Sequence, residues 1–490
     1  MRASVTLACY DCGVTAARVL LLLLACSLCA CESTTKPGYL PDSDAATQRP
    51  QTGGSTCAFV ATPQSFAIPL ASGVESPPLQ QTAGSLPCAV GSGTYDFGLR
   101  DMDGDLREDL VVTRSCDDTT IGVTDWLVYP NTGSGFGAAA RFALPVLPTS
   151  PGCVGASLVD VDGDFKPDLV VTSLCTDTSV GTSRWLVYPS SGTAFAATAQ
   201  PLQLPAAGAL GTYATLEVDA PSCATFQPAY AFFDLTGDHK ADLVVTSACD
   251  DPTVGISSWR VYPGTGTALA APISFTLPGA NTFASPRQGE VACQGAAPSP
   301  RYAVLDFDGD YKPDLVVTKS CVDTSAGSSH WLVYPNGGAS FGQSEIVALP
   351  VLAGAPAGAF EAFADTAQCV SGGGMLAHAL ADVDGDLKPD LVVTRACTDA
   401  SVGVSDWYVF RNQGTTFGTL SAYTLPVVLG ATATAPADLG GALSCTASES
   451  HAAFSAIPLL SPELDLVVTE TCAGGGVGVS SWLVFRPTCP

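Results

Sequence analysis

The segment DFDGDYKPDLVVT at residues 306–318 joins an acidic turn to a short apolar run, and it decides the fold because it recurs. Similar copies begin at Asp101, Asp160, Asp234 and Asp382, and a sixth copy keeps only the tail DLVVT at residues 465–469. The Asp that opens each DLVVT run stands at 109, 168, 242, 314, 390 and 465, so successive repeats start 59 to 76 residues apart. Self-similarity of this kind indicates a repeat architecture.

Each of the first five repeats contains four candidate strands. A WLVYP-like run follows every DLVVT run, and a Gly-rich turn then leads to a run that ends in Leu-Pro. All six Trp residues occupy one position of the second run: Trp126, Trp185, Trp259, Trp331, Trp407 and Trp482. With one more strand before the acidic loop, four short strands form a sheet that cannot bury both of its faces alone. Radial stacking solves this problem, so we expect an all-β, six-bladed β-propeller with four antiparallel strands per blade. A β-sandwich array is the alternative.

The chain before the first repeat holds a strand that the last repeat lacks. Repeat six ends after the WLVFR run at residues 482–486, without a fourth strand. The FAIP run at residues 66–69 matches the FALP run at residues 142–145. An N-terminal strand that completes the last blade would cover two open sheet edges, which are otherwise an aggregation hazard. We therefore expect the N-terminal strand to close the ring, with a Cys57–Cys489 disulfide beside it. The competing arrangement is an open ring, or a seventh blade, with residues 57–87 as part of the tether.

The N-terminal 56 residues read as a targeting segment. Arg2 and Arg18 precede a short apolar run, and the LCAC sequence at residues 28–31 resembles the lipobox of bacterial lipoproteins. Residues 1–30 are thus expected to be a lipoprotein signal peptide, with Cys31 lipidated, or Cys26 in its place; a plain secretory signal and a helical anchor are the alternatives. Glu32 after Cys31 favours the outer membrane, by resemblance to Gram-negative lipoproteins. Residues 31–56 are polar and rich in Pro, Ser and Thr, as in a flexible tether.

The remaining residues, 57–490, form the expected propeller. Its repeats lie near residues 88–145, 153–205, 223–278, 293–350, 369–426 and 445–490, with residues 57–70 added to the last. The chain has a formal net charge of −26 and a pI near 4.2, which argues against nucleic acid or an anionic lipid surface as a partner. We expect a monomer that contacts a membrane only through a lipid anchor and binds an unknown protein or glycan.

The acidic loops predict calcium sites. Four Asp residues at positions 1, 3, 5 and 9 of each loop, with a Gly at position 4, supply the hard oxygen ligands that Ca²⁺ prefers. Magnesium, which keeps more waters, and a set of solvated turn aspartates are the alternatives. We expect about five ions, the weakest at the third loop, where Thr236 replaces an Asp, and none at the sixth. The candidate ligands are Asp101, Asp103, Asp105, Asp109, Asp160, Asp162, Asp164, Asp168, Asp234, Thr236, Asp238, Asp242, Asp306, Asp308, Asp310, Asp314, Asp382, Asp384, Asp386 and Asp390.

Twelve cysteines fall two per repeat, one before the acidic loop and one seven residues after the Asp of DLVVT. In an exported chain such a pattern predicts disulfides. Zinc is the alternative, but no CxxC spacing or paired His accompanies these cysteines. The predicted pairs are Cys88–Cys116, Cys153–Cys175, Cys223–Cys249, Cys293–Cys321, Cys369–Cys397, Cys445–Cys472 and the ring-closing Cys57–Cys489.

The loop DxDGDxxxDL followed by WLVYPNGGxxFG resembles the FG-GAP/VCBS repeat family, known from integrin α-chains and secreted bacterial proteins. The resemblance covers about residues 88–486. It implies a β-propeller in which the acidic loop joins two neighbouring strands of a blade and holds calcium. Integrin-type propellers have seven blades, whereas this sequence contains six repeats.

Three function classes remain open from the sequence. The first is a calcium-binding adhesion or binding module, secreted or on the cell surface, without catalysis. The second is a lectin-like carbohydrate binder, and the third a polysaccharide-degrading enzyme. The four His residues occupy non-equivalent places, and no nucleophile has a recognisable partner. The Trp set is expected to pack between blades, with a sugar-binding ring as the alternative. Another repeated acid is expected to cap a turn, with a ligand-facing role as the alternative: Asp118, Asp177, Asp251, Asp323 and Asp399.

Overall fold

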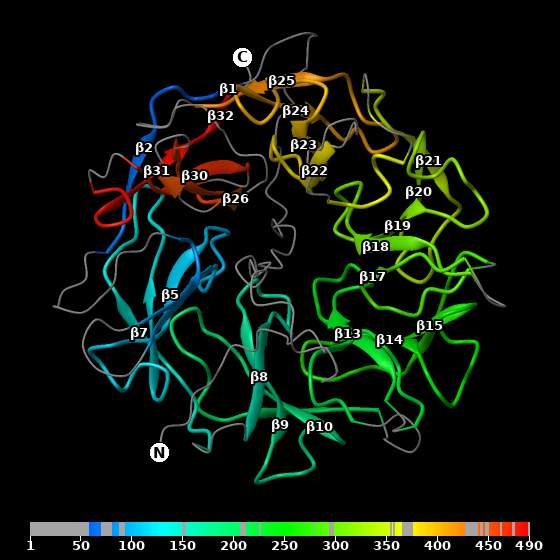
Figure 1. The fold of residues 1–490 in the computed structure, drawn as a ribbon. Coiled ribbons are helices and arrows are strands. Elements are labelled where there is room, and N and C mark those ends of the chain that lie inside the picture. The colour runs from blue at the N-terminus through cyan, green and yellow to red at the C-terminus, as the bar shows by residue number, and fades with distance from the viewer. Residues whose placement is uncertain are drawn as a thin grey trace, which may run out of the picture.

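The computed structural model is a ring of six β-sheet blades around a central axis (Figure 1). The described residues are 58–69, 81–87, 94–148, 153–205, 212–224, 227–279, 281–293, 298–352, 355, 358–364, 376–426, 440–441, 444–445, 450–460, 463–472 and 476–488. Within these ranges the regular structure is entirely strands, and no helix long and apolar enough to cross a membrane is found. The predicted six-bladed β-propeller is confirmed.

The blades follow the repeats in chain order. Blades one and two contain β3 Gly84–Pro87, β4 Thr94–Arg100, β5 Asp109–Arg114, β6 Asp125–Tyr129 and β7 Ala140–Ala143, then β8 Val154–Val159, β9 Asp168–Leu174, β10 Arg184–Tyr188 and β11 Gln200–Gln203. Blades three and four contain β12 Glu217–Val218, β13 Ala229–Phe233, β14 Asp242–Ser247, β15 Ser258–Tyr262 and β16 Ile273–Thr276, then β17 Gln288–Gly289, β18 Arg301–Leu305, β19 Asp314–Lys319, β20 His330–Tyr334 and β21 Glu345–Ala348.

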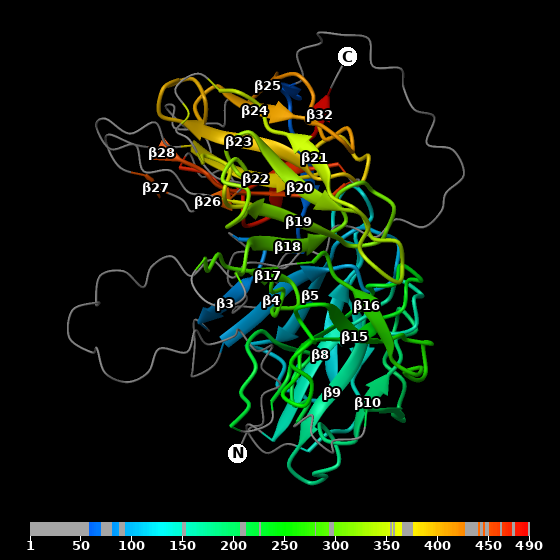
Figure 2. The ribbon, with the colours of Figure 1, turned by 90° about the vertical axis from the view of Figure 1, so that its right-hand side faces the viewer.

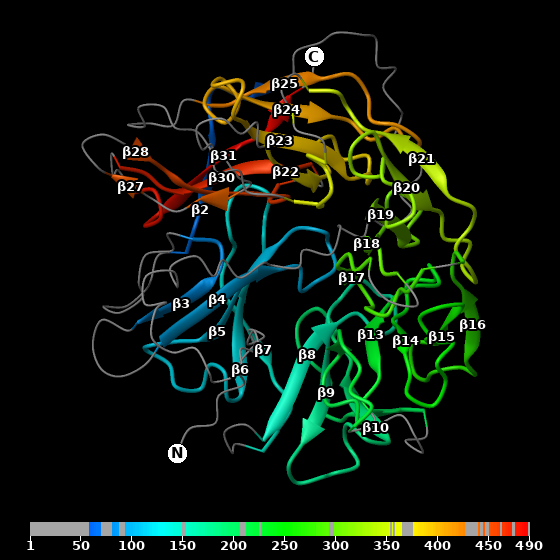
Figure 3. The ribbon, with the colours of Figure 1, turned by 45° about the vertical axis from the view of Figure 1, so that its right-hand side comes forward.

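Blades five and six complete the ring. Blade five contains β22 Leu376–Ala381, β23 Asp390–Ala396, β24 Asp406–Phe410 and β25 Ser421–Thr424. Blade six contains β26 Gly440–Gly441, β29 Ala453–Ile457, β30 Asp465–Glu470 and β31 Ser481–Phe485, together with β2 Gln64–Ala67 from the start of the chain. A short hairpin, β27 Ser444–Cys445 with β28 Ser450–His451, projects beside it (Figures 2 and 3).

Four blades carry one strand more than the four expected. The additional strands β3, β12, β17 and β26 each pair with the free edge of their blade's first predicted strand. Three of them are only two residues long, as in the Glu217–Val218 pairing with Tyr230 and Ala231. Such short segments carry no alternation of apolar and polar residues, so the sequence pattern does not reveal them.

The hydrophobic core lies between the blades. Each DLVVT strand is buried on both faces, because it is in the middle of its sheet with a neighbouring blade against either side. The WLVY strands alternate instead, with Trp and Val buried and the residues between them half-exposed. Each of six core clusters joins residues of two adjacent blades; one packs Trp331 and Val347 of blade four against Leu391 and Val393 of blade five. Burial of the Trp set confirms its expected interblade role.

The N-terminal strand closes the ring as predicted. β2 pairs antiparallel with β31, with Gln64 opposite Val484 and Phe66 opposite Trp482. Phe66 is fully buried and its ring stacks on that of Trp482, with centroids 6.5 Å apart. Figure 1 shows this strand alongside β31, so the two ends of the chain share the sixth blade.

Two further N-terminal residues, Ala58 and Phe59 of β1, imitate a turn that blade six lacks. In other blades a small residue followed by Phe bridges the last strand of the preceding blade, as Ser340 does with Thr276. Ala58 makes the same parallel pairing with Thr424 of blade five, and Phe59 packs edge-on against Trp407 at 5.8 Å. The corresponding Phe341–Trp259 distance is 5.5 Å. The closing strand was predicted from the sequence, but the replacement of the missing turn by Ala58 and Phe59 was not. β1 also pairs with β32 Pro487–Thr488.

Candidate metal centre

In blades one to five the acidic loop connects the DLVVT strand to the strand before it, β18 to β19 in blade four for example. In four loops the carboxylates at positions 1, 3 and 9 converge, so that one oxygen of each lies within 4.8 Å of the others. The converging groups are Asp101, Asp103 and Asp109; Asp160, Asp162 and Asp168; Asp306, Asp308 and Asp314; and Asp382, Asp384 and Asp390. Three of the four predicted carboxylates are therefore brought together in each of these loops.

The carboxylate at position 5 does not belong to the converging group. It pairs instead with the cation two residues later, as Asp310 does with Lys312 Nζ at 2.7 Å and Asp164 with Lys166 Nζ at 2.8 Å. Asp105 with Arg107, Asp238 with Lys240 and Asp386 with Lys388 repeat the pattern. The sequence analysis overlooked this partner, although a basic residue stands at position 7 in all five loops.

Backbone N–H groups orient the acidic side chains. In blade four the two carboxylate oxygens of Asp306 accept hydrogen bonds from Gly309 and Tyr311, both at 2.8 Å. Asp314 accepts from Phe307 at the start of the loop, at 3.1 Å, and from Asn336 after the WLVY strand, at 2.8 Å. Asp314 thereby connects the start of the acidic loop to the residue that follows the WLVY strand.

The loop backbone is strained at one repeated position. The residue at position 6 has φ between 66° and 70° in every one of the five loops, although it is never Gly. A bulky residue in this left-handed region is unusual and costs conformational energy. These residues are Leu106, Phe165, His239, Tyr311 and Leu387. The third loop, where Thr236 replaces an Asp, keeps the same φ at this position.

Burial makes the converging acids hard to ionise together. It raises the pKa of Asp314 to about 8 and that of Asp306 to about 6, and neighbouring carboxylates add to both rises. In the same way burial raises the pKa values of Asp109 and Asp168 to about 7. Carboxyl groups in this state are neutralised by protons or by a cation among them.

The donor set fits calcium. Three carboxylates offer hard oxygen atoms, and water and carbonyl oxygens would complete a shell of six to eight ligands. Two position-3 oxygens, Asp384 Oδ1 and Thr236 Oγ1, are buried without a hydrogen-bond partner, as expected for atoms that face a ligand. Whether an ion binds, and how many, stays a prediction.

The sixth repeat has kept only the structural part of this arrangement. Asp465 is fully buried and its Oδ2 accepts a hydrogen bond from Leu460 at 2.7 Å, as the equivalent Asp does in the other blades. Its loop has lost the position-1 and position-3 carboxylates. The expectation that this repeat binds no ion therefore stands as a prediction.

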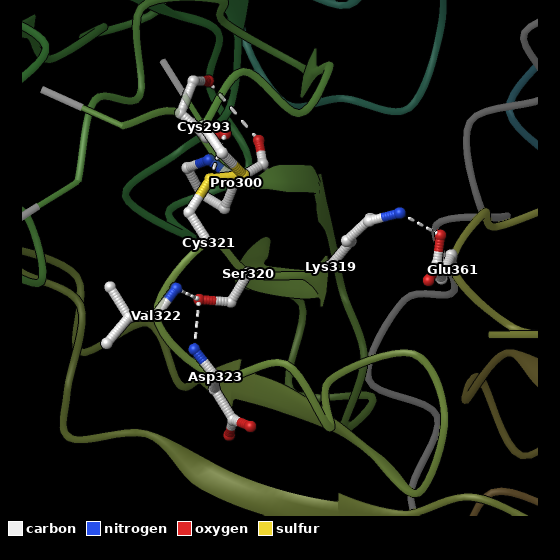
Figure 4. Close-up of a disulfide and its surroundings, with 9 residues drawn as sticks. Cys293, Pro300, Lys319, Ser320, Cys321, Val322, Asp323 and Glu361 are labelled. Carbon is white, nitrogen blue, oxygen red and sulfur yellow. Dashed lines mark hydrogen bonds and ion pairs between the residues drawn. A yellow bond between two sulfur atoms is a disulfide. The ribbon is translucent and has the colours of Figure 1, made fainter. Parts of the chain in front are cut away.

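The disulfides lie at the opposite end of the same strand pairs. Cys153–Cys175, Cys223–Cys249 and Cys293–Cys321 are bonded as the sequence predicted. Figure 4 shows the last of these next to Ser320, whose hydroxyl accepts hydrogen bonds from Val322 and Asp323. Cys116, Cys397 and Cys472 are also disulfide-bonded. Their predicted partners, and the proposed Cys57–Cys489 pair, fall outside the residues or side chains that the structure describes, as do Cys26 and Cys31.

The second repeated acid caps a turn, as expected. Asp323 Oδ1 accepts hydrogen bonds from the N–H and the hydroxyl of Ser325, at 3.0 and 2.6 Å. The other oxygen pairs with His330 Nε2 at 2.9 Å. Thr120, Ser179, Thr253 and Ser401 donate in the same manner in other repeats. These hydrogen bonds lower the pKa of Asp323 to about 2, so this acid stays ionised.

One arrangement on this side contains the residue types of a hydrolase triad. Ser329 Oγ lies 3.0 Å from His330 Nδ1, and His330 bonds Asp323. However, equivalent hydroxyls recur where the next residue is not His: Ser257 and Ser405 bond the carbonyl four residues earlier, as Ser329 does. The hydroxyl therefore has a structural explanation that is independent of His330.

Neighbouring acidic loops touch one another. Gly309 of blade four lies against blade five, where an added Cβ would be 3.2 Å from Lys388. The position-6 side chains of blades two to four form a row, with ring centroids 5.7 Å apart for Phe165–His239 and 5.8 Å for His239–Tyr311. All three are half-buried. We call these three residues the aromatic row; the sequence analysis missed it because the position varies between repeats.

Comparison with known proteins supports the repeat assignment. Residues 101–171 match the family described as FG-GAP-like repeat. No curated protein matches the chain significantly.

Several solved structures resemble this structure weakly. The Tc holotoxin pore of Photorhabdus luminescens has 16% identity over 84% of this chain and 14% of its own, with a TM-score of 0.46. An N-acetylglucosamine-recognising lectin of Agrocybe aegerita has 15% identity over 67% and 65% of the two chains, with a TM-score of 0.34. An α-L-arabinofuranosidase of Fusarium graminearum has 11% identity over 87% and 98%, with a TM-score of 0.33. Likenesses this weak carry no argument about function.

The matched segment contains the complete acidic loops of blades one and two, and the same loop pattern recurs in blades three, four and five. The chain is thus a six-bladed β-propeller, and its residues 101–171 match the FG-GAP-like repeat.

Proposed function

We propose that this protein is an exported, calcium-stabilised binding module without catalytic activity. The observation that carries the proposal is the convergence of three carboxylates in each of four equivalent loops. A bound cation would remove the repulsion among these acids and hold the loops in one shape. The loops and the side chains between them would then form the surface that a partner recognises.

The acidic-loop face is the candidate binding surface. The aromatic row crosses three blades on this face and is bordered by the carboxylates and ammonium groups at positions 5 and 7, such as Asp310 and Lys312. Half-exposed rings beside paired charges favour a glycan over a purely apolar ligand, since sugars offer both C–H faces and hydroxyls. A lectin-like role is therefore the second candidate. The Trp residues do not contribute to it, because all six are buried.

A metal analysis tests the ion part of this proposal. The mature protein in millimolar Ca²⁺ should bind three to five ions, and chelation should lower its melting temperature, because ions that bind only the native state stabilise it. Extracellular calcium modules bind at about 10⁻⁴ to 10⁻³ M, so dialysis should empty the sites. Fewer than two ions per chain in millimolar Ca²⁺ would contradict the proposal.

A glycan array with and without Ca²⁺ tests the ligand part. Binding that requires Ca²⁺ and disappears in Tyr311→Ala would support the lectin role. Leu387→Ala is the matched control, because it changes the same strained position of a loop outside the aromatic row. Absence of glycan binding would leave a protein partner as the ligand class to pursue.

The cellular location is part of the proposal. Disulfides and FG-GAP-like repeats are typical of exported proteins. We propose further that Cys31, or Cys26, carries a lipid that anchors the propeller to the outer membrane of a Gram-negative-type bacterium. Mass spectrometry of the N-terminal peptide would detect the acyl chains, and an unmodified peptide would exclude the anchor.

A further inference from the structure

One position of the repeat separates the blades into two groups. In every blade the last residue of the WLVY strand pairs with the Leu of DLVVT, as Tyr334 does with Leu315, Phe410 with Leu391 and Phe485 with Leu466. The next residue is Pro in blades one to four: Pro130, Pro189, Pro263 and Pro335. In blades five and six it is Arg411 and Arg486.

Arg411 reaches the acidic loop of its own blade. Its Nε lies 3.4 Å from Asp384 Oδ2, and the two side chains are only 14% and 20% exposed. Its Nη2 donates to the hydroxyl of Tyr423 at 3.2 Å, which fixes the guanidinium in place. The following residue, Asn412, donates its N–H to Asp390 at 2.7 Å. A permanent positive charge therefore stands beside the three converging carboxylates of the fifth loop.

Arg486 shows what a cation at this position does when the ion ligands are absent. Its Nη2 donates to the carbonyl of Leu460 in the sixth loop at 3.5 Å, and its charge acts on both Asp465 and Glu463. The blade that has lost the calcium ligand set thus carries its own cation, whereas blades one to four have the uncharged Pro.

We propose that Arg411 is a built-in counter-cation of the fifth acidic loop, which lets this loop fold without calcium and weakens its affinity for Ca²⁺. This inference rests on the proposed calcium binding of the other loops. Two positive groups a few ångströms apart in a partly buried site repel strongly, so the affinity of the fifth loop should be at least about tenfold below that of the fourth. With Thr236 weakening the third loop, the three tight sites are those of blades one, two and four.

Calcium titration of reciprocal variants tests the proposal. Arg411→Gln removes the charge and should raise the affinity of one site at least about tenfold, whereas Arg411→Lys should leave it low. Pro335→Arg places the charge beside the intact ligand set of blade four and should weaken one of the tight sites by a similar factor. Unchanged titration curves for both Arg411→Gln and Pro335→Arg, in a protein that binds Ca²⁺, would overturn the inference.

Melting in excess chelator supplies a readout that does not depend on calcium affinity. Without its counter-cation the fifth loop should be destabilised, so Arg411→Gln should melt several degrees below the wild type in EDTA, and added Ca²⁺ should restore most of the loss. Arg411→Lys should melt close to the wild type in EDTA. If no variant bound calcium, the proposed function would fail, while the EDTA comparison would still decide on Arg411: equal melting of Arg411→Gln and the wild type would refute it.

Discussion

Blades four and six contain the same buried Asp in different surroundings. Asp314 and Asp465 are 1% and 0% exposed, and each accepts a hydrogen bond from the loop that precedes it. The second oxygen of Asp314 binds the N–H of Asn336, but Pro487 stands at that place in blade six and has no N–H to give. Asp465 Oδ1 is accordingly buried without a partner.

The difference shows that the buried Asp belongs to the fold and not to the ion site alone. Blade six keeps it although its loop has lost the other carboxylates. Blade six also relies on replacements. The start of the chain supplies the fourth strand, with Phe66, and the aromatic residue of the missing turn, Phe59. The blade's own Arg486 supplies a cation. The blade can therefore be built without the position-1 and position-3 carboxylates, which agrees with the proposal that these acids bind an ion in the other loops.

Removing the side chain that completes blade six should have the largest effect. Phe66→Ala deletes a fully buried ring between Trp482 and Phe136, and should lower the free energy of unfolding by about 3–5 kcal/mol. The matched control is Phe275→Ala, which removes the equivalent ring of blade three, opposite Trp259. Denaturant unfolding measures both. A loss below about 1 kcal/mol for Phe66→Ala alone would mean that the ring does not depend on its N-terminal strand.

The second effect concerns the covalent lock that we expect beside this strand. β1 and β32 pair with Ala58 opposite Thr488, and the predicted Cys57–Cys489 disulfide would join the next residues of each strand. Replacing both cysteines by Ser should lower stability by about 2–4 kcal/mol. Peptide mapping under non-reducing conditions should recover the cross-linked pair. The double variant Cys293→Ser/Cys321→Ser, in a disulfide that the structure contains, calibrates the loss. Free thiols at both positions in the wild type would contradict the lock.

Much of the fold could be predicted because the strand pattern of one blade recurs six times in the sequence. The period-2 burial of the WLVY strands, the acidic loops and the unmatched FAIP run together specify blades, faces and ring closure. The carboxylates at positions 1, 3 and 9 follow from the same repetition, as does the turn formed by Asp323 and its counterparts.

The remaining features come from residues that depart from the repeat. Arg411 stands where blades one to four have Pro, and its approach to Asp384 has no signal in the sequence other than this missing Pro. Ala58 and Phe59 form a strand too short for any periodicity. The aromatic row arises at a position that varies between Leu, Phe, His and Tyr. Its members meet only because the ring places their loops side by side.

A smaller effect separates two acids of one loop. Asp308→Ala should remove one of the converging carboxylates and abolish one tight calcium site. Asp310→Ala should weaken that site less, by about tenfold or under, because the Asp310 carboxylate is already paired with Lys312 at 2.7 Å. Calcium titration of the two variants shows which substitution weakens binding more. The loop of blade six, which lacks both acids, is expected to contribute no binding to either curve. Equal losses of calcium affinity in the two variants would show that the Asp310 carboxylate gives up its ion pair with Lys312 and binds the ion itself.

The smallest effect is a pH dependence that calcium should suppress. Burial raises the pKa of Asp314 from 3.8 to about 8 and those of Asp109 and Asp168 to about 7. In a chelator the folded protein therefore holds protons that the unfolded chain releases, so stability falls as the pH rises from about 4 to about 8. The melting temperature in EDTA should accordingly be a few degrees higher at pH 5 than at pH 8. Hydrogen bonds hold the pKa of Asp323 near 2, so this acid opposes the trend only below that window.

Calcium should flatten this trend, because a bound ion takes over the charge balance that protons provide in its absence. Asp314→Asn should reduce the slope in EDTA, since a neutral amide cannot titrate, whereas Asp323→Asn should leave the slope between pH 5 and 8 unchanged. Asp465, whose pKa burial raises to about 7, has no ion ligands beside it. A residual slope should therefore persist in saturating Ca²⁺ and become smaller in Asp465→Asn. Stability in EDTA that rises from pH 5 to pH 8 would show that the buried acids of blades four and six do not hold protons as their burial requires.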